Sequence, residues 1–525
     1  MRDFFTPGRS ALYAPNAAIA TSHPLSTTVG LDILRSGGNA VDAAIAAVAV
    51  QSVVDPLMTG IGGDCFALYT PKGASTPVAI NGSGRAPAAA SAGWYRERDL
   101  AIEPTSAHAV TVPGAIGAWA ALVADHGTKS LGDLLQPAIR YAEDGYPVQP
   151  RVAFDWARSA ARVRGDADAA QVFLIDGAAP KVGATMRNPK LAATMRAIAT
   201  GGPKAFYEGL VAEDLVAKLN AKGGLHTLAD FAEAHPDYGT PVTTRYRGYD
   251  VYECPPSGQG LAALMMLNML RHDDVGRLDE IGRVHLFAEV CKVAYHHRDA
   301  HFADMSVHDV PVDYLLSDPW CDAARESLDL KTSSAPNLFS KPEHADTVYL
   351  CVVDRDGNAI SLINSIFQGF GSGIMGPRTG VLLHNRGIAF STDPAHPNAI
   401  APRKRPMHTI IPGMLMRDGQ AVAPFGVMGG HYQAMGHVEL LTGILDRGLD
   451  VQAALDAPRS FAHAGVLQME PRFRPETGET LRAMGHKVVA ADGPLGGGQI
   501  VWIDREKGVL IGGSDFRKDG CALGY

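Results

Sequence analysis

The 525-residue sequence has few cysteines and no long apolar run. Its six cysteines lie far apart without a Cys-x-x-Cys pair, so we expect buried reduced thiols and no disulfide framework. A run of about eighteen apolar residues, the minimum for a membrane-spanning helix, is missing, so no membrane partner is predicted. The stretch Met1–Ser26 lacks the charged start and apolar stretch of a secretory signal, which predicts a cytoplasmic location.

An excess of positive charge is also missing. The formal net charge is -8 and the sequence pI is about 6.2. Without a basic surplus there is no electrostatic footprint for nucleic acid, and the short basic cluster around Lys404 is interpreted as a solvated turn. Hydrophobic residues make up 46% of the chain and charged residues 19%, which is typical of a globular protein with a large core.

Signatures of the common cofactor-dependent and metal-dependent enzymes are missing as well. The sequence has no Walker loop, no His-Glu-x-x-His and no Gly-x-Ser-x-Gly. Residues 371–376, GSGIMG, have the spacing of a dinucleotide fingerprint, but Pro377 follows where a helix would have to begin. None of the nineteen histidines has a second ligand at metal spacing. We therefore expect no cofactor and no metal.

Helix and strand patterns alternate along the chain without a linker. One amphipathic helix is predicted with its cap near Ser26, and an alanine-rich helix follows from Asn39. The second helix is apolar on nearly every face and must be buried, which predicts a layered α/β structure. Further helices are predicted at 112–127, 131–145, 258–272 and 437–448, and strands at 64–70, 76–82, 379–385, 412–428 and 498–515.

The segment Lys341–Ser365 predicts a hairpin. Val348–Val353 is continuously apolar, Asp354–Asn358 forms a turn pattern, and a second strand pattern begins at Ala359. The first strand is apolar on both faces, yet a lone hydroxyl residue, Thr347, stands at its start.

Thr347 could be a nucleophile created by chain cleavage. The loop-like stretch Asp329–Ala345 precedes it, and such a loop tolerates a cut. A cut between Asp346 and Thr347 would leave Thr347 with its Oγ nucleophile and a free α-amine, whose pKa near ~7.7–8.0 suits a general base. Taken alone, the simpler interpretation is favoured, because β-branched residues suit strand starts.

Motif-like segments follow one another along nearly the whole chain. In order, they are GLDILRSGGNAVDAAIA, GIGGDCFALY, TVPGAIGAW, LLQPAIRYAEDGY, FYEGLVAEDL, YRGYDVYECPPSGQG, DTVYLCVVDRDGNAISL, FGSGIMGP, NAIAPRKRP, MGGHYQ and GGSDFRKDGCALGY. Together these segments resemble the γ-glutamyltransferase family of N-terminal nucleophile hydrolases. The resemblance implies a four-layer αββα sandwich of mixed α/β class. It also implies self-cleavage into a large fragment, residues 1–346, and a small fragment, residues 347–525, which form one unit as a heterodimer, with any higher oligomer left open.

The resemblance assigns roles to individual residues. Thr347 matches the nucleophile, and Ser365 stands where the family has a threonine that steadies the amine and hydroxyl of the nucleophile. Gly429 and Gly430 match the paired glycines whose N–H groups form the oxyanion hole, although a simple turn would also explain them. Arg85 matches the arginine that holds the substrate carboxylate, although loop arginines are usually solvated.

The donor pocket departs from the family pattern. HNRGIAF gives Arg386 and Ala389 where the best-known members have a glutamine and the aspartate that binds the substrate ammonium. Phe367 replaces an asparagine, and His408 and Thr409 replace paired serines. Arg386, His408 and Thr409 are therefore predicted to contact substrate, while the ammonium anchor is missing.

These departures predict an amidohydrolase for a small carboxylate-bearing amide, similar to oxamate. Two other activities stay open: γ-glutamyl hydrolysis or transfer on glutathione, and removal of β-lactam side chains. An uncleaved binding module is the remaining alternative. The joint presence of Thr347, Ser365 and the glycine pair argues against it, because a binding module has no use for that set.

Overall fold

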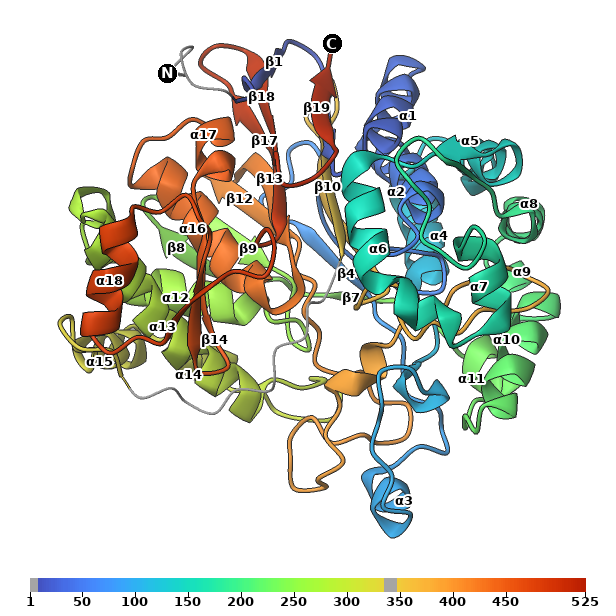
Figure 1. Ribbon diagram of the computed structural model, residues 1–525. Coiled ribbons are helices and arrows are strands. Elements are labelled where there is room, and N and C mark those ends of the chain that lie inside the picture. The colour runs from blue at the N-terminus through green and yellow to red at the C-terminus, as the bar shows by residue number, and fades with distance from the viewer. Residues whose placement is uncertain (1–7, 335–346) are drawn as a thin grey trace.

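The computed structural model describes residues 8–334 and 347–525. Two seven-stranded sheets stack face to face, and helices cover both outer faces, so the fold is the αββα sandwich (Figure 1). Helices α1, α2 and α4 pack on one sheet and α12, α16 and α17 on the other, while α5 packs on α2 and α13 on α12.

The strand order in the first sheet is β19-β2-β10-β11-β3-β4-β7, and in the second β1-β18-β17-β13-β12-β9-β8. Smaller sheets are formed by β14-β15-β16 and by β5-β6. The strands are β1 Leu12–Ala14, β2 Ala18–Thr21, β3 Asp64–Thr70, β4 Val78–Gly82, β5 Tyr146–Pro147, β6 Thr185–Met186, β7 Asp237–Gly239, β8 Val242–Tyr246, β9 Tyr249–Glu253, β10 Val348–Val353, β11 Ala359–Ser365, β12 Gly413–Arg417, β13 Gln420–Met428, β14 Ser460–His463, β15 Val466–Met469, β16 Val488–Ala490, β17 Gly497–Asp504, β18 Val509–Ser514 and β19 Cys521–Gly524.

The helices are α1 Pro24–Arg35, α2 Ala40–Val54, α3 Ala92–Glu97, α4 Ala115–His126, α5 Leu131–Asp144, α6 Pro150–Arg164, α7 Ala167–Phe173, α8 Pro189–Gly201, α9 Lys204–Tyr207, α10 Leu210–Ala221, α11 Leu228–Ala232, α12 Gly260–Leu270, α13 Glu280–His301, α14 Val312–Leu315, α15 Asp318–Glu326, α16 Gln433–Leu445, α17 Val451–Asp456 and α18 Pro475–Ala483. Short 3₁₀ turns are η1 Ala107–Ala109, η2 Val275–Arg277, η3 Arg386–Ala389 and η4 Gly430–Tyr432.

Each large sheet combines strands from both sides of the proposed cleavage point. In the first sheet, β10 and β11 from the later part lie between β2 and β3 from the earlier part. In the second, β12 lies beside β9. The strands of either part alone therefore form only part of each sheet.

The hairpin β10–β11 is confirmed, and it is central. β10 pairs with β11 from Val348↔Asn364 to Val353↔Ala359, and with β2 on its other side. The carboxylate of Asp354 organises the turn by accepting hydrogen bonds from the backbone N–H groups of Asp356 and Asn358. Strands flanked on both edges and covered on both faces are apolar throughout, which accounts for the unbroken pattern.

Alternation along β10 decides which way Thr347 faces. Val348, Leu350 and Val352 belong to the core under the helices, whereas Tyr349, Cys351 and Val353 belong to the core between the sheets. Side chains alternate between the two faces of a strand. Thr347, two residues before Tyr349, therefore faces the space between the sheets.

The first predicted helices are confirmed, with one change. Asn39 caps α2 in a capping box with Asp42, and every residue of α2 is buried. Helix α1, however, begins at Pro24 with His23 as its cap, and Ser26 lies inside the helix, where its hydroxyl donates to the carbonyl of Ala47. The cap predicted near Ser26 is thus His23, three residues earlier, because proline fits the first helical turn.

The strand predicted at residues 379–385 is replaced by isolated bridges, Met375↔Leu382 and Gly62↔Leu383. Gly371, Gly373 and Gly380 have positive φ angles and fold this stretch back on itself. The apolar residues Val381, Leu382 and Leu383 are buried all the same, because they belong to the core between the first sheet and its helices. An apolar run alone could not separate a strand from a buried loop.

All six cysteines are free: five are buried, and Cys521 is partly exposed. Within residues 8–334 and 347–525, every helix is too short or too polar to cross a membrane. The predicted cleavage residue Asp346 and most of the predicted loop lie outside the described residues.

Candidate active site

Thr347 and Ser365 meet at the open end of the β10–β11 pair. Thr347 Oγ1 lies 3.0 Å from Ser365 Oγ, and Thr347 is only 1% exposed. Ser365 Oγ also accepts from the backbone N–H of Phe367 at 2.9 Å and from Arg386 Nη2 at 3.4 Å. With two donors already directed at it, Ser365 is best placed to donate its own proton to Thr347 Oγ1. The predicted contact is present.

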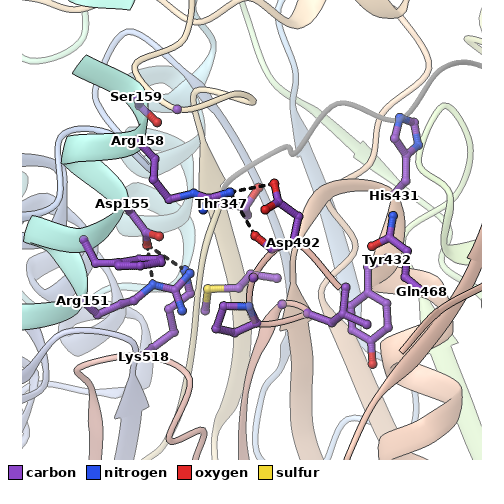
Figure 2. Close-up of a pocket in the computed structure, with 18 of the residues that line it drawn as sticks. Arg151, Asp155, Arg158, Ser159, Thr347, His431, Tyr432, Gln468, Asp492 and Lys518 are labelled. Carbon is purple, nitrogen blue, oxygen red and sulfur yellow. Dashed lines mark hydrogen bonds and ion pairs between the residues drawn. The ribbon is translucent and has the colours of Figure 1, made fainter. Parts of the chain in front are cut away.

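Thr347 lines a cavity of about 710 Å³ (Figure 2). Helix α6 forms one wall and the loop 492–496 another, while Tyr432, Phe461 and Leu495 supply apolar surface. Gly429 lies in the same lining. Cavities of this volume hold drug-sized molecules.

The paired glycines end β13 in an unusual backbone conformation. The φ angles are +124° at Gly429 and +57° at Gly430, in the region that favours glycine. Gln259 fixes this turn from beneath, because its Nε2 donates at 2.8 Å to the carbonyls of Gly430 and Thr409. Arg298 Nη1 in turn donates to Gln259 Oε1 at 2.9 Å. The turn is thus held in place by side chains, and its Gly429 shares the cavity lining with Thr347.

Two histidines in the lining are poor bases. His431 and His463 stack with ring centroids 5.0 Å apart. Burial, aided by the charge of Arg298, lowers the pKa of His463 to about 3 and holds the pKa of His431 well below its usual range. A general base works best with a pKa near the operating pH, so neither imidazole suits that role near neutrality.

A buried charged cluster lies behind Ser365. The carboxylate of Asp64 is 3.3 Å from His384 Nδ1, 2.9 Å from His408 Nε2 and 3.3 Å from Arg386 Nε. Arg386 Nη1 also donates to Thr409 Oγ1 at 2.9 Å. All five side chains are fully buried. Arg386 therefore joins this cluster directly to Ser365.

Burial and pairing set the charges in this cluster. Burial alone would raise the pKa of Asp64, but its close contacts with His384 and His408 outweigh burial and hold that pKa well below its usual range. Burial and the charge of Arg386 lower the pKa of His408 to about 3. Burial also lowers the pKa of Arg386, to about 10, which still leaves it charged near neutrality. The central pair is thus Asp64 carboxylate with Arg386 guanidinium.

Removing the carboxylate should be costly. In the uncut Thr347→Ala background, Asp64→Asn should lower the free energy of unfolding by about 3 kcal/mol or more, because it leaves Arg386 buried without a counter-charge. Urea unfolding followed by circular dichroism measures this. Asp492→Asn is the control: that side chain is 80% exposed and pairs only weakly, so a loss of at most about 1 kcal/mol is expected. Equal losses would contradict the charge assignment.

The pH dependence has a definite sign. The pKa of Asp64 is depressed in the folded protein, so its contribution to stability is present above the ordinary aspartate pKa of about 3.9. It is lost as the pH falls through the lower folded pKa. The Asp64→Asn variant should therefore lose less stability on acidification than its parent.

The remaining predicted residues lie elsewhere. Arg85 Nη2 is 2.9 Å from Asp237 Oδ2, and its Nη1 is 3.8 Å from Asp304 and donates to the carbonyl of Arg403. It lines a separate cavity of about 510 Å³. Among the described residues, the lining around Thr347 does not include Arg85, Arg386, His408 or Thr409. Their contact with substrate remains a prediction.

Sequence reasoning missed Asp64 and His384. Asp64 stands inside the segment GIGGDCFALY, but no spacing connects it with residues more than 300 positions away, so only the fold brings them together. The arginines of α6 were also missed. A helical reading of residues 150–164 would have found Arg151, Arg158 and Arg162 on one stripe.

A second unforeseen cluster joins His285, Glu289 and His486, whose ligand atoms lie within 4.8 Å of one another. The expectation that histidines lack partners of this kind was wrong, because His486 comes from a distant segment. His285 Nδ1 and His486 Nε2 are 2.7 Å apart, and Lys292 Nζ lies 2.7 Å from Glu289 Oε1. The ammonium of Lys292 already neutralises Glu289, so we assign no metal here.

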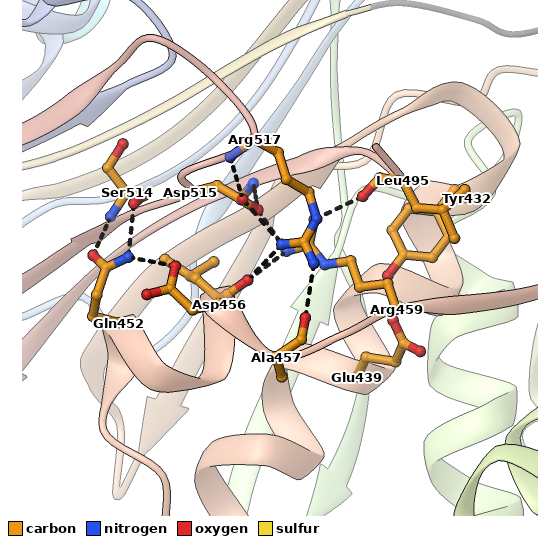
Figure 3. Close-up of polar contacts among 12 residues, drawn as sticks. Tyr432, Glu439, Gln452, Asp456, Ala457, Arg459, Leu495, Ser514, Asp515 and Arg517 are labelled. Atoms are coloured by element: carbon orange, nitrogen blue, oxygen red, sulfur yellow. Dashed lines mark hydrogen bonds and ion pairs between the residues drawn. The ribbon is translucent and has the colours of Figure 1, made fainter. Parts of the chain in front are cut away.

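A buried ion network supports the cavity floor (Figure 3). Arg459 pairs with Asp515 at 2.6 Å and donates to the carbonyl of Leu495 at 2.8 Å, while Arg517 contacts Asp515 and Glu470. Burial would raise the pKa of Asp515, but Arg459 and Arg517 outweigh it and bring it to about 2. The network ties the C-terminal segment to the loop that lines the cavity.

The chain is similar to known proteins over nearly its whole length. The family model described as Gamma-glutamyltranspeptidase matches residues 26–525. The glutathione hydrolase-like YwrD proenzyme of Bacillus subtilis is 34% identical over 96% of this chain and 98% of that protein. The oxamate amidohydrolase proenzyme of Klebsiella pneumoniae is also 34% identical, over 96% of this chain and 97% of that protein.

Solved structures agree with the fold. The crystal structure of cephalosporin acylase from Bacillus halodurans superposes with a TM-score of 0.93 at 40% identity, covering all of this chain and 98% of that one. The γ-glutamyltranspeptidase of Helicobacter pylori gives a TM-score of 0.56 at 27% identity over 63% of this chain.

Proposed function

Since the chain belongs to the gamma-glutamyltranspeptidase family and is therefore a hydrolase of C–N bonds, we propose that it matures by self-cleavage between Asp346 and Thr347. The relatives named as proenzymes support this maturation. The products are a large fragment, 1–346, and a small fragment, 347–525, held together as a heterodimer by the shared sheets. No cofactor takes part in this scheme.

The observation that carries the proposal is the contact of Thr347 Oγ1 with Ser365 Oγ at 3.0 Å, on a cavity that also exposes Gly429. Cleavage would place the new α-amine on the same residue as the hydroxyl. That amine has a pKa near ~7.7–8.0 in peptides, which makes it a better base than the buried histidines nearby.

Catalysis then follows from the position of each group. The α-amine takes the Thr347 Oγ proton as the oxygen attacks the amide carbonyl, and the Gly429–Gly430 backbone N–H groups stabilise the oxyanion. The amine leaving group departs with the transferred proton and leaves an ester on Thr347. Water, activated by the same α-amine, hydrolyses that ester and releases the acid. Ser365 keeps the Thr347 hydroxyl oriented before each attack on a substrate.

The proposed substrate is an amide that carries a carboxylate but no α-ammonium group, with oxamate as the smallest example. Among the residues that the structure describes, four basic side chains line the cavity against two carboxylates: Arg151, Arg158, Arg162 and Lys518 against Asp155 and Asp492. Ala389 stands where the family's ammonium-binding aspartate would be. An ammonium buried without a partner costs several kcal/mol, so ammonium-bearing substrates are disfavoured.

Three amides compared side by side test this preference. We expect kcat/KM for oxamate to exceed that for a γ-glutamyl 4-nitroanilide and for glutathione by at least about tenfold. The reason is that the α-ammonium group of both γ-glutamyl compounds loses the charged contact that the family's aspartate makes, because Ala389 stands in its place. Ammonia, nitroaniline and cysteinylglycine release measure the three rates on cleaved protein. A preference for the γ-glutamyl compounds would assign the second candidate, γ-glutamyl hydrolysis or transfer.

The cavity volume favours one further candidate, an acylase for larger amides. A space of about 710 Å³ exceeds what oxamate fills, and the structure at 40% identity is titled a cephalosporin acylase. Hydrolysis of a carboxyacyl β-lactam faster than of oxamate would favour this activity. Both reactions use the same Thr347 chemistry.

A further inference from the structure

Helix α6 presents a basic stripe to the cavity beside Thr347. The lining includes Arg151, Phe154, Arg158 and Arg162 from this helix. Their spacing of three, four and four residues places them on one helical face. Figure 2 shows Arg151 and Arg158 extending from α6 toward the cavity.

Most basic groups of this wall are committed to the fold. Arg151 Nε donates to Asp155 Oδ2 at 2.7 Å, and Arg151 also donates to the carbonyl of Arg517. Lys518 Nζ lies 3.6 Å from the same Asp155. Arg162 Nη1 donates to the carbonyl of Gly371 at 3.0 Å. These contacts tie α6 to neighbouring segments.

Arg158 differs because its partner is exchangeable. Its Nη2 donates at 2.9 Å to both the carboxylate and the carbonyl of Asp492. The side chain of Arg158 is 44% exposed and that of Asp492 is 80% exposed. Ion pairs this exposed are weak, so a second carboxylate in the cavity competes with Asp492 on nearly equal terms.

The surroundings of Arg158 suit the group that would replace Asp492. A guanidinium binds a carboxylate through two parallel hydrogen bonds. Phe154, 48% exposed, has its ring 5.6 Å from the Arg158 guanidinium carbon and offers an apolar surface to the chain that carries the carboxylate. Arg85, by contrast, already pairs with Asp237 and lines the other cavity.

We infer that Arg158 binds the substrate carboxylate in place of Asp492, and so selects anionic amides at this site. The inference rests on the proposed amide hydrolysis and adds the residue that provides its specificity. The carboxylate belongs either to the acyl group or to the leaving amine, and the chemistry of recognition is the same.

Three chromogenic amides distinguish a carboxylate on the acyl group from a carboxylate on the leaving amine. Valeryl-4-nitroanilide is neutral, glutaryl-4-nitroanilide carries the carboxylate on its acyl group, and valeryl-3-carboxy-4-nitroanilide carries it on the leaving group. The readout is the ratio of kcat/KM for each anionic amide to that for the neutral one. This ratio cancels any general effect of a substitution on the catalytic machinery.

Arg158→Gln should lower that ratio at least about tenfold for one of the two anionic amides, mainly through KM, as loss of a charged hydrogen bond implies. Arg158→Lys should restore part of it, because a lysine keeps the charge but not the paired geometry. The matched control is Arg164→Gln on the same helix. Within the part of the chain that the structure describes, the Arg164 guanidinium donates only to the carbonyl of Gly177, so this change should leave the ratio unchanged.

Asp492→Asn should act in the opposite direction. Removing the competing carboxylate should lower KM for the preferred anionic amide by about two- to fivefold, the effect of losing one exposed pair. An unchanged or raised KM would overturn the exchange. The inference is also overturned if Arg85→Gln lowers the ratio tenfold while Arg158→Gln leaves it unchanged.

Binding without turnover keeps this test independent of the proposed activity. Titration calorimetry of glutarate into the cleaved protein should give a Kd that rises at least about tenfold in Arg158→Gln and not in Arg164→Gln. If no amide is hydrolysed but glutarate binding depends on Arg158, the proposed activity fails and the subsite stands. If glutarate binds both variants equally, the subsite fails.

Discussion

Replacing Thr347 by alanine is expected to leave the purified protein as one chain of 55.5 kDa without amidase activity. The parent protein should instead give two bands of about 37 and about 19 kDa, in proportion to the fragment lengths. Both steps fail together because the Thr347 hydroxyl is the nucleophile for cleavage and for turnover, and only cleavage produces the α-amine base. A denaturing gel and N-terminal sequencing of the smaller band measure this.

Thr347→Ser is the matched control, because serine keeps both the hydroxyl and the amine. It should still yield two fragments and measurable turnover. An intact parent chain, or a small fragment that begins at a residue other than Thr347, would contradict the assignment. Hydrolysis by the uncut alanine variant would contradict it as well.

Gly429→Val should lower kcat by about 10² or more in protein that is already cleaved. A side chain at Gly429 would lie 2.9 Å from the Cα of Gly496, and the φ angle of +124° is strained for any L-residue. The turn must then move, and with it the N–H donor for the oxyanion. KM should change less than kcat, because the lost contact is made to the transition state.

Maturation must be separated from catalysis in this experiment. Co-expressing the two fragments, with the small one beginning at Thr347 after removal of its initiator methionine, supplies cleaved protein whatever the variant. Gly448→Ala is the matched control: its φ angle is also positive, at +63°, and the space around it is open. A kcat unchanged by Gly429→Val would reject the oxyanion assignment.

The central hairpin and the buried helix α2 could be predicted from local patterns. Continuous apolar residues in β10, an Asp-Gly-Asn turn and a capping residue at Asn39 are signals that neighbouring residues carry by themselves. The apolar stretch at 379–385 has a similar composition but is a loop, because the positive φ angles of flanking glycines prevent a ladder. Local composition thus indicated burial more reliably than strand pairing.

The candidate active site also has a part that the sequence predicts and a part that only the fold reveals. By itself the sequence determined the family, and the resemblance predicts the roles of Thr347, Ser365 and the glycine turn, because these residues occur in continuous segments that match collinearly. Only the tertiary structure decided which charges face the cavity. Asp64 neutralises Arg386, and Asp237 pairs with Arg85, while α6 places Arg158 in the lining of the cavity at Thr347. Those pairings join residues far apart along the chain. Electrostatic pairing depends on the distance between charges in space, and the packing of the two sheets and their helices sets that distance.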